Sequence, residues 1–302
     1  MYRRDDDRLP TYHFDSLVRE SMAHAVFTRI GGVSHEPFST LNVGGSVGDD
    51  VDAVAENHAR IYAHMEQGAA STVSPQQVHG NQVAVVTVKD AGSVIPGTDG
   101  LVTSVPGLAL LLRFADCQPI LLYDPVQHGV GLIHAGWRSI AQAIARRAVE
   151  TMERELGTRP EDIIAGLGPA IGPCCYTVGD NVASAMGYVL EDWDRALTSD
   201  GDRWRLDLSE ANRQQLAAAG VRHIEQADLC TACHNREFFS HRADKGHTGR
   251  FAVVAYLKAG MESTARVPQK RNMGQSETGE IEEPDSLHPP GLPAFEENPG
   301  GS

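Results

Sequence analysis

Short, nearly continuous apolar runs separated by polar turns recur through the body of the chain and predict buried β-strands. Five segments have this pattern: Leu108–Arg113, Ile120–Tyr123, Gly129–His134, Ile163–Leu167 and Phe251–Leu257. Runs without regular alternation are typical of strands covered on both faces. His24–Ile30, which ends before two glycines, and the alternating Gln82–Val88 predict two further strands.

Helical periodicity with start and stop signals marks two further segments. The carboxylate of Asp49 or Asp50 can cap a helix that runs through Met65. Apolar residues recur every four positions in Ser139–Leu156, and Gly157 follows as a stop signal. We therefore predict one helix in each segment.

A third helix is predicted from Asp207, with Glu210 at the third position, to a stop at Gly220. We find no internal repeat. Several strands follow one another without an intervening helix, which favours an α+β fold over a doubly wound sheet. We predict a single layered α+β domain in which mixed β-sheets are packed by helices.

The composition divides the chain into three parts. Residues 263–302 contain six prolines, five glycines, seven acidic and three basic residues, with few large apolar side chains. Such a segment cannot bury enough surface to offset its ordering entropy, so we predict a disordered acidic tail. A tail that binds a protein partner is the alternative. Residues 1–12 are predicted to form a loose arm, and residues 13–262 the folded domain.

Charge and hydropathy exclude several classes of protein. Lys and Arg number 26 against 40 Asp and Glu, giving a net charge of −14, which disfavours a nucleic-acid binder. No apolar run approaches the ~18 residues that a membrane span needs. Acidic residues follow Arg3 and Arg4 directly, without an apolar stretch. We therefore expect no signal peptide and a cytoplasmic protein.

The five cysteines are interpreted as reduced thiols. They are Cys117, Cys174, Cys175, Cys230 and Cys233. Cys230–His234 matches the c-type haem attachment pattern, but that attachment needs export. A zinc ribbon needs two Cys pairs with matching spacing, and the adjacent pair does not match.

Three short segments at predicted strand ends carry the side chains best suited to chemistry. Gln77–Gly80 contains His79, Ala115–Pro119 contains Cys117, and one histidine opens His134–Arg138. Two imidazoles and a thiolate suit zinc, and three protein ligands leave a fourth position for water or substrate. From composition alone, ordinary packing and turn roles remain the simpler explanation.

Three further polar residues stand near predicted turns. Arg138 lies at the start of a predicted helix, where a bidentate donor could bind an anion. Arg29 precedes a glycine turn, and Asn42 could act as a polar clamp. A surface ion pair for Arg138 and turn chemistry for Arg29 and Asn42 are the alternatives.

Seven motifs occur in an order that resembles the laccase-domain family, also called the multicopper polyphenol oxidase type. They are Thr28–Ser34, Leu41-Asn42, Gln77–Gly80, Ala115–Pro119, His134–Arg138, Gly168–Gly172 and Phe239–Arg242. The resemblance covers about residues 13 to 258. Bacterial members are also named purine nucleoside phosphorylases, and some are named peptidoglycan editing factors.

The resemblance implies a fold related to deamidating cysteine-hydrolase toxins and a zinc enzyme. His79, Cys117 and His134 match the family's zinc ligands and catalytic site. The implied reaction is phosphorolysis of adenosine, inosine or guanosine to the base and ribose 1-phosphate, with methylthioadenosine cleavage and adenosine deamination as further activities. Arg29 and Arg138 are our candidates for binding phosphate.

Asn42 is our candidate for binding the sugar or the phosphate of the substrates. The chain departs from the family pattern at three positions. Ser139 replaces the usual glycine, Thr177 a common acid and His241 a usual tyrosine. These changes leave the implied zinc ligands intact and bear on substrate preference.

Rival functions remain. A copper polyphenol oxidase is disfavoured because the 13 histidines include no His-x-His pair and no Met lies near Cys117. A cysteine hydrolase or amidase acting on peptidoglycan precursors would use Cys117 as its nucleophile. A non-catalytic binding protein is the third alternative.

Overall fold

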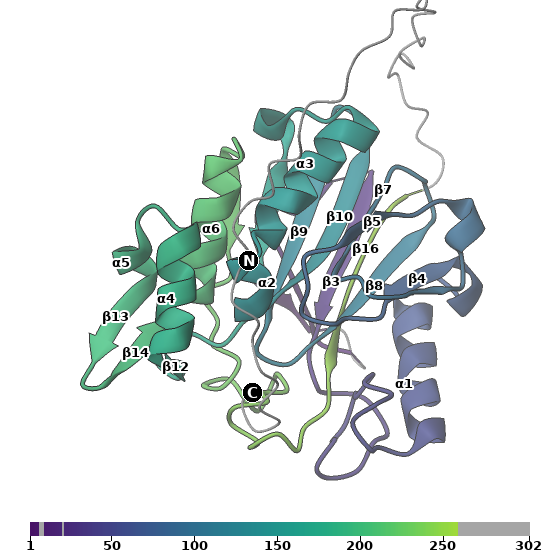
Figure 1. Cartoon of the computed structure of the whole chain (residues 1–302). Coiled ribbons are helices and arrows are strands. Elements are labelled where there is room, and N and C mark those ends of the chain that lie inside the picture. Colours follow the sequence, from purple (N-terminus) through teal and green to yellow (C-terminus); the bar gives the residue numbers. More distant parts are fainter. Residues whose placement is uncertain (6–8, 20, 259–302) are drawn as a thin grey trace, which may run out of the picture. The chain divides into compact units, whose positions relative to one another are not determined.

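Two β-sheets lie face to face, with helices on their outer faces (Figure 1). The structure is a computed structural model that describes residues 1–5, 9–19 and 21–258. The first sheet has the strand order β1 (Tyr2–Arg4), β2 (Thr11–His13), β3 (Met22–Phe27), β16 (Phe251–Leu257), β8 (Ala109–Phe114), β4 (Thr72–Pro75) and β6 (Val94–Ile95). The second has the order β15 (His223–Gln226), β11 (Ile164–Leu167), β9 (Gln118–Asp124), β10 (Gly129–Ala135), β7 (Gly100–Thr103) and β5 (Val83–Val85).

The remaining elements surround the two sheets. A small third sheet has the order β12 (Thr177–Val178), β14 (Arg203–Leu206) and β13 (Leu197–Asp200). The helices are α1 (Val51–His64), α2 (Trp137–Ala141), α3 (Ile144–Leu156), α4 (Asp180–Val189), α5 (Trp193–Ala196) and α6 (Leu208–Ala218). Short 3₁₀ turns lie at Asp15–Leu17, Ala69–Ser71, Val88–Asp90 and Pro160–Asp162.

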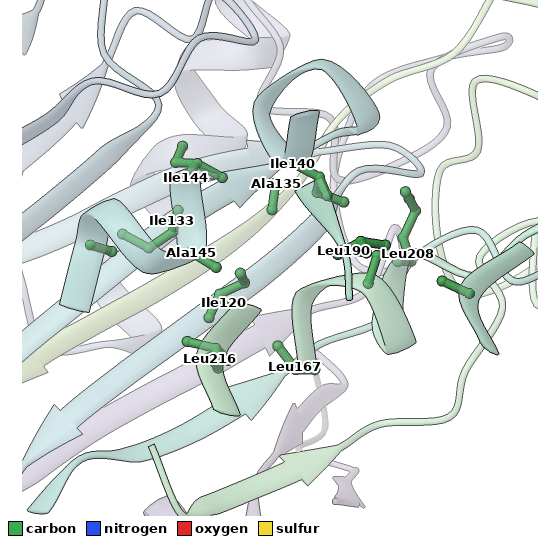
Figure 2. Packing of buried hydrophobic residues seen from close by; sticks show 14 of the residues in the cluster. Ile120, Ile133, Ala135, Ile140, Ile144, Ala145, Leu167, Leu190, Leu208 and Leu216 are labelled. Atoms are coloured by element: carbon green, nitrogen blue, oxygen red, sulfur yellow. The ribbon is translucent and has the colours of Figure 1, made fainter. Parts of the chain in front are cut away.

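Three apolar clusters join the layers. One lies between the sheets and contains Leu112 and Leu132, and a second packs Ile61 of α1 against the outer face of the first sheet. Figure 2 shows the third, in which Ile120 and Ile133 of the second sheet face the covering helices. β9, β10 and β16 are buried along their whole lengths, which accounts for their continuous apolar runs.

Parallel and antiparallel strand pairs occur within both large sheets, so the predicted α+β class is confirmed. β4 pairs in parallel with β6 and β8, and β11 with β15, whereas β9, β10 and β7 pair antiparallel. The predicted caps also form: Asp50 accepts a hydrogen bond from the Ala53 amide, and Asp207 accepts from Ser209 and Glu210.

The predicted helix over Ser139–Leu156 is wrong in one respect, because the chain forms two helices there. Ala143 lies between them with φ of 57°, in the left-handed region, which ends α2 and redirects the chain into α3. Periodicity alone did not show this break, since the apolar positions continue across it. Gly157 ends α3 as predicted, with φ of 72°.

The N-terminal arm is more ordered than we expected. β1 pairs with β2 in antiparallel register, and the amino group of Met1 bonds to the Glu225 carboxylate. This ion pair and the strand pairing give residues 2–4 a fixed place in the first sheet. The predicted tail, residues 263–302, lies outside the described residues.

A buried histidine near this arm makes stability depend on pH. His24 Nε2 accepts a hydrogen bond from the Phe14 amide at 2.9 Å, so this nitrogen carries no proton in the fold. Burial, with a smaller contribution from nearby His13, lowers the pKa of His24 to about 3. In the unfolded chain this histidine has a pKa of ~6.5, so below that pH the unfolded chain binds more protons than the folded chain.

We expect the free energy of unfolding to fall as the pH drops from 7 to 5, with His24 contributing about 2 kcal/mol of that loss. Urea unfolding of the wild type and of His24→Gln at both pH values measures this share. The variant should lose about 2 kcal/mol less between the two pH values. An identical pH dependence in both proteins would contradict the assignment.

Candidate metal centre

Three side chains from separate segments meet where the two sheets are connected. Cys117 lies on the turn that leads from β8 in the first sheet to β9 in the second. His134 is the penultimate residue of β10 and pairs with Pro119, so it lies beside this turn. His79 follows β4. One ligand atom from each of the three residues lies within 4.8 Å of the others.

The close approach of these side chains requires a glycine. A Cβ atom on Gly136 would lie 2.8 Å from Cys117 Sγ and 3.3 Å from His79 Cδ2. Any side chain at this position would therefore displace the thiol and the imidazole. The glycine of the His134–Arg138 motif thus has a steric function at the site.

Asp99, directly before β7, holds both histidines. Its buried carboxylate accepts hydrogen bonds from the amides of Val78, His79 and Gly80, at 3.1, 2.9 and 2.8 Å. These bonds fix a loop in which His79 has φ of 60°. The same carboxylate lies 2.8 Å from His134 Nδ1, so Nδ1–H donates to it and Nε2 is left to act as a ligand.

Electrostatics favour the charged forms of this group. Burial alone would raise the pKa of Cys117, but His134 and His79 outweigh it and lower the pKa to about 6. Burial alone would lower the pKa of His134, but Cys117 and Asp99 raise it to about 9. Asp99, although buried, has a lowered pKa because His134 and the loop amides hydrogen-bond to it. The carboxylate of Asp99, the thiolate of Cys117 and the imidazolium of His134 are thus all stabilised, and a metal ion bound here would displace the proton on His134 Nε2.

The donor set fits a thiophilic divalent metal. Two imidazole nitrogens and one thiolate are ligands of zinc, and they also occur with copper. Metal-bound histidines usually donate their other N–H to a carboxylate, as His134 does to Asp99. Three protein ligands leave one tetrahedral position for an exchangeable oxygen ligand. The site can therefore bind a metal and present it to a substrate.

Asp116, which precedes Cys117, anchors a second group of loops. Its carboxylate accepts hydrogen bonds from the hydroxyls of Thr231 and Ser240, at 2.6 and 2.7 Å, and from the Arg242 amide at 2.7 Å. The residue has φ of 84°, in the left-handed region. These bonds fix the turn that presents the Cys117 thiol and tie it to residues 231–242.

A tyrosine and several arginines lie around the thiol. The Arg242 guanidinium lies 5.0 Å from the centre of the Tyr176 ring and donates to the Thr177 carbonyl. Burial raises the pKa of Tyr176; the charge of Cys117 raises it further, and Arg242 and Arg138 oppose this. Arg250 is partly buried and lies within electrostatic range of Cys117. Positively charged arginine side chains therefore surround the Cys117 thiol.

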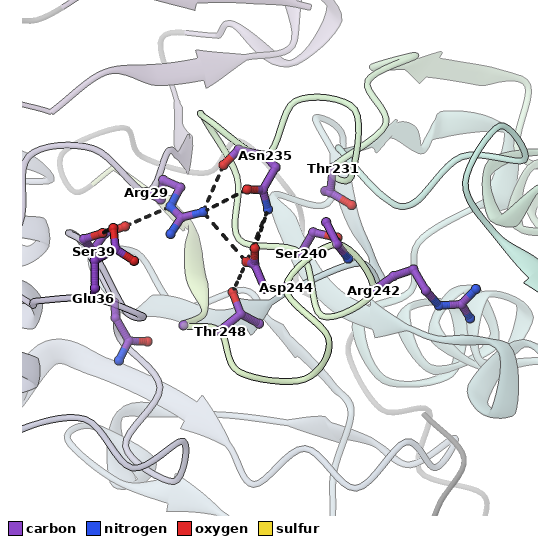
Figure 3. Close-up of polar contacts among 12 residues, drawn as sticks. Arg29, Glu36, Ser39, Thr231, Asn235, Ser240, Arg242, Asp244 and Thr248 are labelled. Atoms are coloured by element: carbon purple, nitrogen blue, oxygen red, sulfur yellow. Dashed lines mark hydrogen bonds and ion pairs between the residues drawn. The ribbon is translucent and has the colours of Figure 1, made fainter.

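Arg29 is not brought to the three metal-ligating candidates. Its guanidinium donates to the Ser39 and Asn235 carbonyls at 2.8 and 2.9 Å, and lies 3.8 Å from Asp244. In Figure 3, Arg29 lies on one side of Ser240 with its guanidinium toward Asn235 and Asp244, and Arg242 lies on the other side and points away. Arg29 lines a separate cavity of about 610 Å³.

Asn42 is fully buried, and its side chain bonds to groups of the protein itself. Its Nδ2 donates to Asp49 at 2.8 Å, and its Oδ1 accepts from the amides of Gly44 and Arg250, each at 2.8 Å. Asn42 therefore positions the backbone of Arg250. Arg138, in contrast, lies within electrostatic range of Tyr176 and 4.9 Å from the Trp137 ring.

Sequence reasoning missed Asp99 and Arg250 because neither belongs to the motifs we recognised. Each is an ordinary polar residue beside an apolar strand, and only the tertiary fold shows its partners. The spacing argument against a zinc ribbon did not anticipate a second group of cysteines that meet in the fold. The thiols of Cys174, Cys175, Cys230 and Cys233 meet, with all sulfur atoms within 4.8 Å of one another.

These features define a layered α+β protein with a His-Cys-His site suited to a metal. A family model described as multi-copper polyphenol oxidoreductase laccase matches residues 23–258, and the chain belongs to this family. The resemblance inferred from the motifs is thus confirmed.

Curated relatives carry a different functional name. The chain is 43% identical over 244 residues to "Purine nucleoside phosphorylase YlmD" of Geobacillus stearothermophilus, covering 76% of this chain and 87% of that protein. It is 36% identical over 230 residues to "Purine nucleoside phosphorylase YfiH" of Escherichia coli K12, covering 76% and 91%. Homologues thus support an enzyme of the purine nucleoside phosphorylase kind.

Solved structures of relatives have the same fold. The crystal structure of YlmD from Geobacillus stearothermophilus superposes with a TM-score of 0.81 at 37% identity, covering 85% of this chain and 98% of that one. A Bacillus licheniformis protein titled YfiH gives a TM-score of 0.80 at 36% identity, covering 85% and 99%. Separately, none of the helices in the described part of this chain is long and apolar enough to cross a membrane.

Proposed function

We propose that the chain is a zinc-dependent purine nucleoside phosphorylase whose metal is held by His79, Cys117 and His134. The observation that supports this most is that one ligand atom from each of the three residues lies within 4.8 Å of the others. In addition, the Asp99 carboxylate orients the His134 ring. Adenosine, inosine and guanosine are the proposed substrates, with the free base and ribose 1-phosphate as products. The names of the relatives favour this reaction over copper-dependent oxidation.

The reaction breaks the bond between C1′ of the ribose and N9 of the purine, while a phosphate oxygen bonds to C1′. Zinc, when bound, would supply a Lewis acid that holds and polarises an oxygen of the substrate. Cys117 and His134 serve the site by binding the ion in their deprotonated forms, and Asp99 keeps His134 in the tautomer that does so.

Phosphate binding is assigned to Arg138 and Arg242. The charges of both arginines and of Cys117 influence the pKa of Tyr176. The Arg242 amide also donates to Asp116, the residue before Cys117. Guanidinium groups bind phosphate oxygens in a bidentate manner. The Tyr176 hydroxyl stays protonated because burial raises its pKa, so it can donate a hydrogen bond to the substrate.

Arg242→Ala should raise the KM for phosphate about 10- to 100-fold, because it removes a charge-assisted contact. The matched variant is Arg29→Ala, which removes an arginine that bonds to the Ser39 and Asn235 carbonyls and lines the separate cavity. Arg29→Ala should lower the free energy of unfolding by about 2 kcal/mol and change the phosphate KM less than about twofold. Steady-state kinetics at varied phosphate and urea unfolding measure both effects; the reverse pattern would contradict the assignment.

The functional test is nucleoside turnover with and without phosphate. Metal-replete protein is incubated with adenosine or inosine, and the free base and ribose 1-phosphate are quantified together. The proposal predicts equal amounts of both products and no base release above background when phosphate is omitted. Base release at the same rate without phosphate would make the enzyme a nucleoside hydrolase instead.

Methylthioadenosine cleavage and adenosine deamination are proposed as secondary activities. One metal cannot lie at C1′ and at C6 of the purine in a single pose, so deamination requires a second orientation of the substrate. Ammonia released from adenosine in the absence of phosphate measures this activity.

We further propose a cytoplasmic enzyme whose catalytic domain spans residues 13–262 and precedes an acidic tail at 263–302.

A second candidate, a cysteine amidase, is favoured by one specific observation. Cys117, His134 and Asp99 are linked in the order of a thiol, a base and an orienting carboxylate. Such an enzyme would form an acyl bond to Cys117 and act on peptidoglycan precursors. Release of an amino acid from a muramyl peptide by metal-free protein would support this candidate.

A further inference from the structure

A second group of thiols lies apart from the three candidate ligands already described. Cys174 and Cys175 belong to the loop after β11, and Cys230 and Cys233 to the loop after β15. Each residue contributes one sulfur, and all four sulfurs lie within 4.8 Å of one another. Cys233 Sγ lies 3.5 Å from both Cys174 Sγ and Cys175 Sγ.

The sulfur spacing matches one tetrahedral metal ion. Zinc–sulfur bonds of ~2.3 Å place the sulfurs of a tetrahedral site about 3.8 Å apart. The observed separations of 3.5 Å are close to this value and far longer than the ~2.05 Å of a disulfide bond. Ligands of a cluster with several iron atoms lie further apart, so the space suits a single ion.

Two backbone amides bond to one of the four thiols. The Gly172 amide donates a hydrogen bond to Cys230 Sγ at 3.3 Å, and the Cys233 amide bonds to the same side chain. A zinc ion with four thiolates carries a net charge of −2. The Arg205 guanidinium donates to the carbonyls of Pro173 and Cys174, at 3.3 and 3.1 Å, and forms an ion pair with Asp200 at 2.9 Å. It therefore places a cation next to the Cys174 loop.

The thiols join two loops that both reach the candidate metal centre. The loops already share backbone hydrogen bonds, from Ala170 to Leu229 and from Thr231 to Ala170. Cys175 directly precedes Tyr176, and Cys230 directly precedes Thr231, whose hydroxyl donates to Asp116. An ion bound here would fix the Tyr176 loop relative to the turn that presents Cys117.

We propose that Cys174, Cys175, Cys230 and Cys233 bind a structural zinc ion as a tetrathiolate site, separate from the ion at His79, Cys117 and His134. Binding converts the four thiols to thiolates and releases their protons to solvent, without a redox step. The ion stabilises the fold because the unfolded chain does not hold the four sulfurs together. The alternative use of these thiols is a reversible disulfide, for which exposed Cys174 and Cys233 are the nearest pair.

Metal content of paired variants of the full chain tests the proposal. Wild-type protein loaded with zinc and then desalted should retain about two ions per chain. His79→Ala/His134→Ala and Cys174→Ser/Cys233→Ser should each retain about one. X-ray absorption of the histidine variant should show sulfur neighbours alone, at ~2.3 Å. A histidine variant without zinc, or with nitrogen neighbours, would overturn the proposal.

Thiol reactivity keeps the test decisive if the cysteine variant fails to fold. Cys174 and Cys233 are exposed, so a free thiol at either position reacts with a disulfide reagent in native protein. In zinc-loaded wild type we expect both to be protected until a strong chelator is added, with a fall in melting temperature on chelation. Immediate reaction, or a Cys174–Cys233 disulfide in protein isolated without reductant, would overturn the proposal.

Discussion

Cys117→Ser should lose one metal ion per chain and at least about a thousandfold in phosphorolysis rate. The thiolate is one of three candidate ligands, and serine offers an alcohol that stays protonated at neutral pH and binds zinc poorly. Lewis-acid stabilisation is worth several kcal/mol of transition-state energy, which corresponds to three or more decades in rate. Metal analysis and turnover of the same preparation measure both losses.

The matched comparison is the Cys174→Ser/Cys233→Ser variant, which alters thiols outside the proposed catalytic site. It should also lose one ion, but its remaining ion should be bound by nitrogen and sulfur together. A Cys117→Ser protein that keeps its full metal content and yet has no turnover would contradict the ligand role. It would instead support covalent catalysis by the thiol.

Asp99→Asn should weaken metal binding at the three-residue site about 10- to 100-fold. The carboxylate accepts hydrogen bonds from three loop amides and from His134 Nδ1–H, so all four of these hydrogen-bond partners are donors. An asparagine must turn an NH₂ group toward some of these donors. The His79 loop and the His134 ring both lose their orientation, which lowers metal affinity measured by competition with a chromophoric chelator.

Asp124→Asn is the control for a buried aspartate that is merely structural. Asp124 lies at the far end of β9, is fully buried, and accepts hydrogen bonds from the amides of Val126 and Gln127. Its substitution should lower the free energy of unfolding by about 1–3 kcal/mol and leave metal affinity unchanged. Equal metal affinity in Asp99→Asn and wild type would show that Asp99 does not position the histidines.

The order and type of most central elements could be predicted because local signals agreed with the fold. The limits of β10 and β16 were set by apolar runs, and the starts of α1 and α6 by capping aspartates. The break at Ala143 could not be predicted, since an alanine with a left-handed backbone has no sequence signature. The small third sheet and α4 were also missed, because their segments lack strong periodicity.

The candidate site could be predicted only as far as its motifs extend. His79, Cys117 and His134 stand in recognisable segments, and the fold brings them together. Asp99 acts through hydrogen bonds to residues that are distant in the sequence, so composition and spacing could not identify it as a site residue. Arg29 and Asn42 lie in motifs too, yet their hydrogen bonds serve loop structure. A motif therefore does not distinguish a residue with a chemical role from one that holds a loop in place.

The central claim is that nucleoside phosphorolysis depends on a metal held by His79, Cys117 and His134. The most direct measurement removes all metal with a chelator, returns zinc in steps, and follows ribose 1-phosphate formation from inosine and phosphate. Metal-free protein should form no product. Activity should rise with zinc until the three-residue site is filled, and reloaded Cys117→Ser should stay inactive. Phosphorolysis by metal-free protein at the rate of the zinc-loaded enzyme would contradict the account.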